Sequence, residues 1–298
     1  MPSPTSKKPS LRRAEAGATT TDDFLGGRIG VLQPKGGHRA GSDAVFLAAA
    51  VPARAGMRVL DVGAGVGVAG LCILARVPSA ELTAIEICAR LCALAAENAE
   101  RNGFGDKVDV LNADVTAPGK SRRAAGLLSE SYDQVIANPP FHAEGKVRAA
   151  PDRGRAAAHV MNREGLAAWV RFFAAMAAPK ALLTLIHRPD CLGELLPLLA
   201  GRFGDIAVFP LFPKRGEPAT RIIVQAEKGS RAGLSLLPGL ALHQENGSYS
   251  AEAEAVLRGG EALDLGRAKN GKGPRPGANA PAALSTEREA ASKGGKIR

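Results

Sequence analysis

From residue 57 onward, short apolar runs rich in β-branched residues alternate with longer amphipathic stretches. The short runs predict β-strands, and the longer stretches have the spacing of α-helices. Such alternation is typical of a parallel sheet with helices on both faces. The pattern predicts strands near 58–62, 81–86, 108–112, 133–137 and 181–187, and helices near 66–76, 88–102, 163–177 and 190–200.

The end of this alternating region has a different pattern. Two strand-like runs, 205–209 and 220–225, are separated by three prolines and a glycine, with no helical stretch between them. We expect these runs to pair antiparallel, because a parallel connection needs a longer crossover. The sequence therefore predicts an α/β fold with a mostly parallel seven-stranded sheet that ends in an antiparallel hairpin. Residues 234–266 are ambiguous and predict at most a short strand and a helix.

The two ends of the chain differ in composition from its body. The 298 residues have a formal net charge of +10. Residues 1–20 contain four Lys/Arg against one Glu, and residues 267–298 contain eight against two, so the body is close to neutral. Both ends lack periodic apolar positions, and we expect them to be disordered basic arms. Such arms attract phosphate backbones, although tails that only improve solubility have the same composition. Between them we expect a hairpin and a helix over 21–52, packed on a catalytic domain over 53–266.

Composition also indicates where the protein works. The N-terminus has no apolar segment after its charges, and no run is long enough to cross a membrane, so a cytoplasmic location is expected. The cysteines have neither metal-ligand spacing nor the pattern of a disulfide framework. We therefore expect no metal site and reduced, mostly buried thiols. We also expect a monomer or a weak dimer. The four cysteines are Cys72, Cys88, Cys92 and Cys191.

A glycine-rich segment follows the first strand of the alternating region. The run 59–62 is followed by Gly63, Gly65 and Gly67. Glycines let a chain turn sharply and let a ligand approach the backbone closely. Residues 65–70 also satisfy the dinucleotide pattern G-x-G-x-x-G, but that match alone is weak. The segment predicts a ligand-binding loop between a strand and a helix.

Acidic residues at three successive strand ends favour S-adenosyl-L-methionine over NAD as the ligand. Asp61 precedes the loop, where a carboxylate can reach the ammonium group of the cofactor. Glu86 closes the second strand, where its two oxygens can accept both ribose hydroxyls. Asp114 follows the third strand and can accept a hydrogen bond from the adenine amino group. Ligands of open α/β sheets lie at these carboxyl ends. The predicted cofactor-binding residues are Asp61, Gly63, Gly65, Gly67, Glu86 and Asp114.

The segment Asn138-Pro139-Pro140-Phe141 follows the apolar run 135–137. Two consecutive prolines cannot continue a strand or a helix, and they hold Asn138 in an extended conformation. A polar amide is therefore expected at the end of a buried strand, at the same edge of the sheet as the glycine loop.

This tetrapeptide resembles the N/D-P-P-Y/F motif of the amino-methyltransferases, which act on DNA adenine, rRNA guanine, tRNA adenine and protein glutamine. A parallel α/β sheet that ends in an antiparallel hairpin is likewise characteristic of the class I, Rossmann-like methyltransferases. The resemblance implies that the Asn138 side-chain oxygen and the Pro139 carbonyl accept the two N–H bonds of the target amine. It also makes Pro140 and Phe141 part of the catalytic motif, with Phe141 able to stack on a flipped base.

The segment ahead of the glycine loop resembles one group of these enzymes. Phe24 to Gly27, Gln33-Pro34 and His38 to Val45 are similar to the lead-in of the bacterial tRNA(Val) adenine-N6 methyltransferase family, and the resemblance covers roughly residues 22–228. It implies methylation of N6 of the adenosine 3′ of the anticodon, with tRNA as the partner. Asp43 is then a candidate for contact with the methionine part of the cofactor. Its alternative role is to stabilise the N-terminus of a helix that follows Ser42.

Basic residues near the motif are candidates for contact with RNA phosphates. The stretch 142–155 is a candidate loop at the mouth of the site, and the terminal hairpin could extend the same basic patch. An ordinary solvated loop would have a similar composition. The candidates are Lys146, Arg148, Arg153 and Arg155 in the loop and Lys214 and Arg215 in the hairpin.

Other functions are compatible with parts of this pattern. An rRNA guanine-N2 methyltransferase often has the sequence N-P-P-F-H, as at 138–142, and a release-factor glutamine methyltransferase uses a related motif. A non-catalytic RNA-binding protein with the same fold is disfavoured by the intact Asp61, Glu86, Asp114 and Asn138. An NAD-dependent oxidoreductase leaves the tetrapeptide unexplained.

Overall fold

The computed structural model describes residues 18–37, 39–140 and 163–266. The described part of the chain forms a two-stranded hairpin and a nine-stranded sheet, with strand order β10-β8-β9-β7-β6-β3-β4-β5 and β11 also paired with β8. The strands of the large sheet are β3 (Arg58–Val62), β4 (Glu81–Glu86), β5 (Val108–Asn112), β6 (Tyr132–Ala137), β7 (Ala177–His187), β8 (Phe203–Lys214), β9 (Arg221–Lys228), β10 (Leu234–Leu236) and β11 (Leu240–His243).

The expected mostly parallel sheet with a terminal antiparallel hairpin is confirmed. Strands β3 to β7 run parallel, and β9 pairs antiparallel with both β7 and β8. Two short strands that the sequence did not resolve, β10 and β11, pair with β8 and extend the sheet beyond the seven expected strands. Since β3 to β7 are parallel, their carboxyl ends lie along one edge of the sheet, which we call the carboxyl edge.

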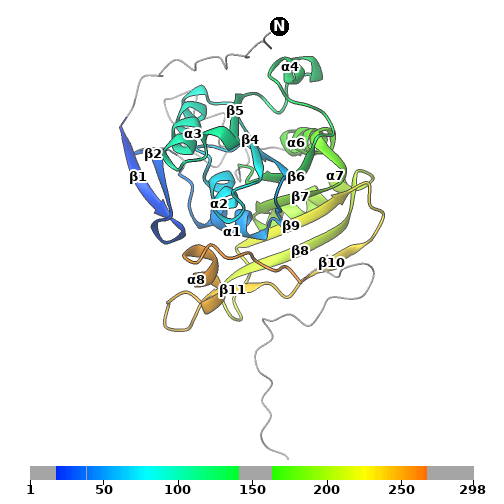
Figure 1. Ribbon diagram of the computed structural model, residues 1–298. Coiled ribbons are helices and arrows are strands. Elements are labelled where there is room, and N and C mark those ends of the chain that lie inside the picture. The colour runs from blue at the N-terminus through cyan, green and yellow to red at the C-terminus, as the bar shows by residue number, and fades with distance from the viewer. Residues whose placement is uncertain (1–17, 38, 141–162, 267–298) are drawn as a thin grey trace, which may run out of the picture. The chain divides into compact units, whose positions relative to one another are not determined.

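Helices cover both faces of the sheet. One buried cluster joins α1, α2, part of α3 and α8 to one face, and a second joins α6 and α7 to the other. Figure 1 shows α1 and α2 together, with α8 beside β11. The helices are α1 (Ser42–Ala50), α2 (Val68–Arg76), α3 (Ala89–Arg101), α4 (Gly119–Ala124), α6 (Arg163–Met176), α7 (Leu192–Leu199) and α8 (Ala251–Leu257).

The N-terminal hairpin begins earlier than the sequence indicated. Strands β1 (Thr19–Phe24) and β2 (Ile29–Pro34) pair antiparallel around a helical turn at Leu25–Gly27. Residues 25–27 form the turn of the hairpin, where Gly26 and Gly27 have positive φ. Thr19 and Thr20, placed in the basic arm by their composition, belong to β1. The remainder of that arm, and the basic tail 267–298, lie outside the described residues.

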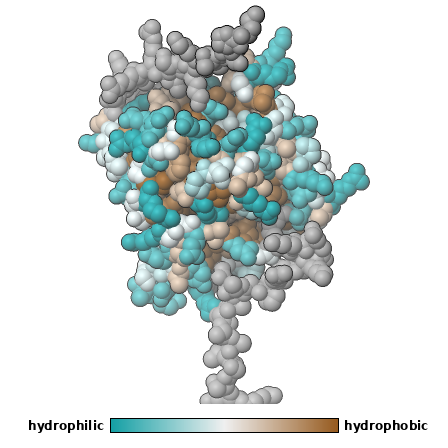
Figure 2. Space-filling view, in the orientation of Figure 1, coloured by the Kyte–Doolittle hydropathy of each residue, from teal (hydrophilic) through white to brown (hydrophobic). Residues whose placement is uncertain are grey.

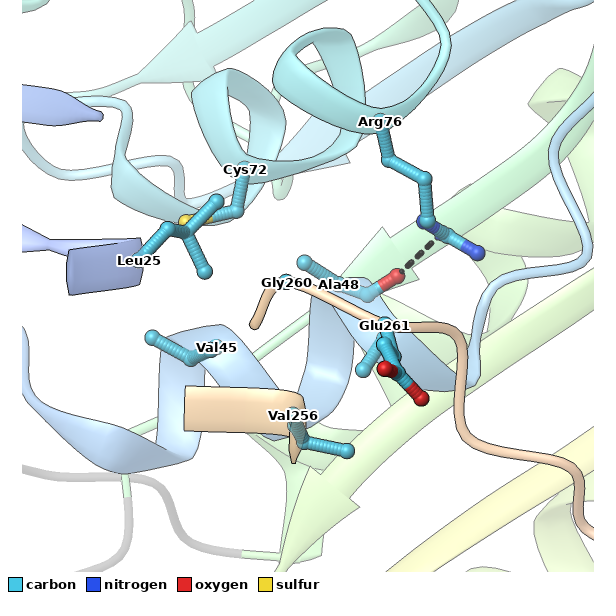
Figure 3. Close-up of a pocket in the computed structure, with 9 residues that line it drawn as sticks. Leu25, Val45, Ala48, Cys72, Arg76, Val256, Gly260 and Glu261 are labelled. Atoms are coloured by element: carbon cyan, nitrogen blue, oxygen red, sulfur yellow. Dashed lines mark hydrogen bonds between the residues drawn. The ribbon is translucent and has the colours of Figure 1, made fainter. Parts of the chain in front are cut away.

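The C-terminal segment packs onto the same layer as α1 and α2. The backbone N–H of Leu263 donates to the carbonyl of Ala49 at 2.9 Å. The Arg76 guanidinium donates to the carbonyls of Ala48 and Val51 at 2.7 and 2.8 Å, which satisfies the free C-terminus of α1. A cavity of about 10 Å³ remains between these elements, with Cys72 on one wall (Figure 3). It holds about one water molecule at most, so it is a packing gap.

All four cysteines are free thiols, as expected. Cys72 and Cys92 are buried and Cys191 is partly buried, whereas Cys88 is exposed. Burial raises the pKa of the Cys72 thiol to about 12, so this thiol stays protonated at physiological pH.

The described residues lack what a membrane-spanning helix or a metal centre requires. Polar side chains are spread over the face seen in Figure 2, with smaller apolar areas between them. Within the described residues, every helix is too short or too polar to span a membrane. The same residues contain no group of three or more His, Cys, Asp or Glu side chains arranged to hold a metal ion.

Candidate active site

The predicted site residues converge at the carboxyl edge because neighbouring strands are in register. Val62, at the end of β3, pairs with Ile85 of β4 on one side and with Ala137 of β6 on the other. Glu86 and Asn112, the last residues of β4 and β5, also pair. The glycine loop, the second acidic residue and the Asn-Pro-Pro segment therefore leave three adjacent strands at the same level of the sheet.

The glycine loop is held close to the end of β4. The backbone N–H groups of Gly63 and Ala64 both donate to the carbonyl of Ile85 at 2.9 Å. The loop then turns through Gly67, whose φ of +90° is in the left-handed region, and α2 begins at Val68. The helix was predicted from residue 66, and this left-handed glycine explains the later start.

Trp169, which lies on the face of the sheet opposite to α2, packs against Gly63, the first glycine of the loop. A Cβ at Gly63 would lie 2.8 Å from the Cη2 atom of Trp169, so a side chain fits there only if the indole shifts. Trp169 comes from α6 and makes an edge-to-face contact with Phe173, with centroids 5.9 Å apart. Sequence reasoning missed Trp169 as a site residue. The available signal was that it is the only tryptophan in the chain and lies on the helix predicted near 163–177, after the tetrapeptide.

Asp61 lies one residue before the end of β3 and is 2% exposed. Its Oδ2 atom has no hydrogen-bond partner among the described residues. Burial raises the pKa of the Asp61 carboxyl to about 7, with a smaller increase from the negative charge of Glu86, while the backbone N–H of Gly70 lowers it. In the protein without ligand this carboxyl is therefore close to half-ionised at neutral pH.

Glu86 connects the loop to the end of its own strand. Its Oε2 accepts from the backbone N–H of Gly65 at 3.0 Å, and its Oε1 accepts from the N–H of Cys88 at 3.0 Å. Each carboxylate oxygen has a second acceptor position. The carboxylate is thus fixed in orientation and can still accept two hydrogen bonds from a ligand.

Asp114 lies two residues beyond β5, in a local turn. Its Oδ1 accepts from the N–H and the hydroxyl of Thr116, both at 2.7 Å. Asn112 donates its side-chain amide to the carbonyls of Glu86 and Ile87 at 2.9 and 2.8 Å. These two bonds tie the ends of β4 and β5 together, two residues before Asp114.

Asn138 immediately follows β6, and its Oδ1 is buried without a hydrogen-bond partner among the described residues. Pro139 is buried and Pro140 is partly exposed. Phe141, the last residue of the motif, lies outside the described residues. The same is true of four of the candidate RNA contacts, Lys146, Arg148, Arg153 and Arg155.

Asp43 occupies the first turn of α1 and forms an ion pair across the edge. Its Oδ2 accepts from the Arg221 guanidinium at 2.8 Å. Arg221 is the first residue of β9, and its neighbour Ile222 pairs with His187, the last residue of β7. Burial lowers the pKa of His187. The structure therefore places Asp43 at the carboxyl edge, where its carboxylate already has a cationic partner.

The two remaining basic candidates lie further along the same edge. Lys214 ends β8 and donates to the carbonyl of Glu245 at 3.4 Å, and Arg215 follows it as an exposed residue. A larger cavity, of about 230 Å³, lies at the opposite ends of β3, β4 and β5, away from the predicted site. It is lined by Arg58, Glu81, Leu82, Thr83, Asp106, Lys107 and Asp109.

The residues at the edge fit S-adenosyl-L-methionine. An unpartnered buried acceptor costs about 1–3 kcal/mol, so the Oδ2 of Asp61 and the Oδ1 of Asn138 are sites for ligand donors. S-adenosyl-L-methionine carries donors of the kind that such acceptors lack, namely an ammonium group and two ribose hydroxyls. The sheet order, the glycine loop and these acidic residues define the class I, Rossmann-like methyltransferases.

Comparison with known proteins agrees with this class. The family model described as "methyltransferase small domain" matches residues 39–182. The crystal structure of a predicted O-methyltransferase from Agrobacterium tumefaciens is 30% identical and covers 74% of this chain and 98% of its own, with a TM-score of 0.64.

Curated relatives carry a more specific name. A tRNA1(Val) (adenine(37)-N6)-methyltransferase of Bacteroides fragilis is 32% identical over 37% of this chain and 44% of its own length. This first match thus spans less than half of the relative. The protein of the same name from Yersinia enterocolitica is 26% identical over 84% of this chain and 94% of its own. The chain belongs to the class I, S-adenosylmethionine-dependent methyltransferases, and its residues 39–182 are similar to the methyltransferase small domain.

Proposed function

We propose that this protein transfers a methyl group from S-adenosyl-L-methionine to an exocyclic amino group, N6 of an adenosine in tRNA. The observation that carries this proposal is the buried Oδ1 of Asn138, which has no hydrogen-bond partner among the described residues and lies at the same edge as the glycine loop. The names of the curated relatives support adenosine of tRNA(Val) as the target.

The chemistry depends on how the amine is held. An exocyclic amine of a purine is a weak nucleophile because its lone pair is delocalised into the ring. Asn138 Oδ1 and the Pro139 carbonyl each accept a hydrogen bond from one N–H of the amine. With both N–H bonds held, the nitrogen lone pair points away from these two acceptors. The bound cofactor supplies the methyl group. Because positioned acceptors orient the amine, the site needs no strong general base, and the released proton passes to water.

The number of acceptors distinguishes amine from hydroxyl targets. An amine has two N–H bonds for the two acceptors at 138 and 139, whereas a hydroxyl has a single hydrogen. The Asn-Pro-Pro segment therefore favours N-methylation in this chain, although the relative from Agrobacterium tumefaciens is named a predicted O-methyltransferase. Guanine-N2 of rRNA and glutamine-N5 of a protein also present two N–H bonds and remain alternative targets.

The other roles are assigned within the same proposal. Asp61 binds the ammonium group of the cofactor, Glu86 its ribose and Asp114 its adenine. Phe141 stacks on the target base. We propose that the basic residues of 142–155, together with Lys214 and Arg215, contact the RNA backbone, and that Asp43 acts through its ion pair with Arg221.

Substitution of Asn138 tests the proposal. We expect Asn138→Ala to bind S-adenosyl-L-methionine with the affinity of the wild type by calorimetry, and to lose at least about 100-fold in methyl transfer to unmodified tRNA. Asn246→Ala is the matched control, because its Oδ1 accepts hydrogen bonds in an exposed turn. Unchanged transfer by Asn138→Ala would refute its role. Transfer of a labelled methyl group to an rRNA fragment or a release factor, but not to tRNA, would show that the target is one of the alternatives.

A further inference from the structure

The N-terminal hairpin is joined to α3 by two asparagine side chains one turn apart. Asn102 accepts from the N–H of Gly30 at 3.0 Å and donates to its carbonyl at 2.9 Å. Asn98 accepts from the N–H of Leu32 at 2.8 Å and donates to its carbonyl at 3.1 Å. Four residues of helix rise about 6 Å, close to the ~6.8 Å that separates alternate residues of a strand. The two amides therefore bond to the edge of β2 as a neighbouring strand would.

Asn98 makes one contact that Asn102 lacks. Its amide nitrogen also donates to the carbonyl of Val66 at 3.0 Å, and the side chain is fully buried. Val66 lies inside the glycine loop, between Gly65 and Gly67. A single amide thus spans the hairpin and the cofactor loop, which lie 66 and 32 residues away along the chain.

This contact fixes one peptide unit of the loop. The carbonyl of Val66 accepts from Asn98, and the N–H of Gly67 on the same peptide donates to the carbonyl of Ala64 at 2.9 Å. With both polar groups engaged, the peptide cannot rotate without losing two hydrogen bonds. Without Asn98, the Val66 carbonyl would lose a partner in a region where unpaired polar groups are costly.

We propose that Asn98 is a positioning residue through which the N-terminal hairpin orders the glycine loop, so that the hairpin is part of the cofactor site. The inference rests on the proposed function only in taking the loop as the site of S-adenosyl-L-methionine, and it is independent of the RNA target. By linkage, the coupling works in both directions: an ordered hairpin favours cofactor binding, and bound cofactor orders the hairpin.

The test compares Asn98→Ala with Asn102→Ala. Each variant loses a pair of bonds to β2, and the lost contact with the loop belongs to Asn98 alone. We expect a larger decrease in thermal stability for Asn98→Ala, because it also leaves the Val66 carbonyl without this partner, and a roughly tenfold weaker Kd for S-adenosyl-L-methionine, about 1.4 kcal/mol, for Asn98→Ala only. In steady-state kinetics the KM for the cofactor should rise while kcat stays near the wild-type value. Equal Kd values for the two variants would overturn the proposal.

A second measurement uses the unmodified protein and so does not depend on how the variants fold. Hydrogen exchange is followed by mass spectrometry with and without saturating S-adenosyl-L-methionine. We expect the cofactor to slow exchange in β2 as well as in the loop, and to slow it more in β2 than in β11, which pairs with β8. Protection confined to the loop, or equal protection of β2 and β11, would overturn the coupling. The Kd and hydrogen-exchange measurements do not require methyl transfer, so unchanged transfer by Asn138→Ala, which would refute the proposed function, and failure of this proposal are separate results.

Discussion

Replacing Asp61 with asparagine should stabilise the cofactor-free protein at alkaline pH while weakening its affinity for cofactor. The carboxyl is fully buried, and its pKa is raised from 3.8 to about 7 mainly by that burial. Below pH 3.8 it is protonated in both the folded and the unfolded chain. Between pH 3.8 and about 7 the unfolded chain has lost the proton and the folded chain retains it. The free energy of unfolding therefore falls as the pH rises through this interval.

The size of the effect follows from the difference between the two pKa values. An interval of ~3 pKa units at ~1.36 kcal/mol each corresponds to about 4 kcal/mol of lost stability above pH 7. Asparagine keeps the size and the acceptor oxygen that faces the Gly70 N–H, but it does not ionise. We therefore expect Asp61→Asn and wild type to have similar stability at pH 3.5, and the variant to be more stable by up to about 4 kcal/mol at pH 8.

Urea denaturation at a series of pH values measures this difference, with the fluorescence of Trp169, the only tryptophan, as the signal. Asp106→Asn, which removes an exposed carboxyl before β5, is the control. Parallel stability curves for Asp61→Asn and wild type between pH 3.5 and 8.5 would refute the reasoning. In calorimetry at pH 8, the variant should bind S-adenosyl-L-methionine about 10- to 100-fold more weakly, because a hydrogen bond between charged groups is worth about 1.5–3 kcal/mol.

Two further outcomes are expected. Gly63→Ala should cost about 1–3 kcal/mol of stability, more than Gly56→Ala. Both positions have positive φ, but an added Cβ at Gly63 also collides with Trp169. Chemical denaturation of both variants, and of Gly63→Ala combined with Trp169→Phe, checks whether the larger loss of stability depends on the indole. Deleting residues 1–17 and 267–298 removes net charges of +3 and +6, so tRNA binding should weaken and log K should fall less steeply with log salt concentration; identical salt slopes would show that the tails do not contribute.

The described elements show which features short-range sequence patterns could predict. The bounds of β3, β4 and β5 agree with the strands expected from the short apolar runs. The placement of Asp61, Glu86 and Asn138 at one edge also followed, because parallel strands in register must bring their carboxyl ends together. These features depend on residue patterns within a few positions, which is why the sequence alone determined the fold class and the location of the candidate site.

Tertiary structure decided the environment of those residues. The raised pKa of Asp61 requires the burial that only the packed sheet provides. The ion pair of Asp43 joins residues 178 positions apart, and the bonds of Asn98 to the hairpin span 66 positions. An asparagine on an amphipathic helix has no local pattern that identifies its partner. Contacts of this kind depend on how distant elements pack, so the chain's own sequence gave the residues at the site while the folded structure determined how they are held.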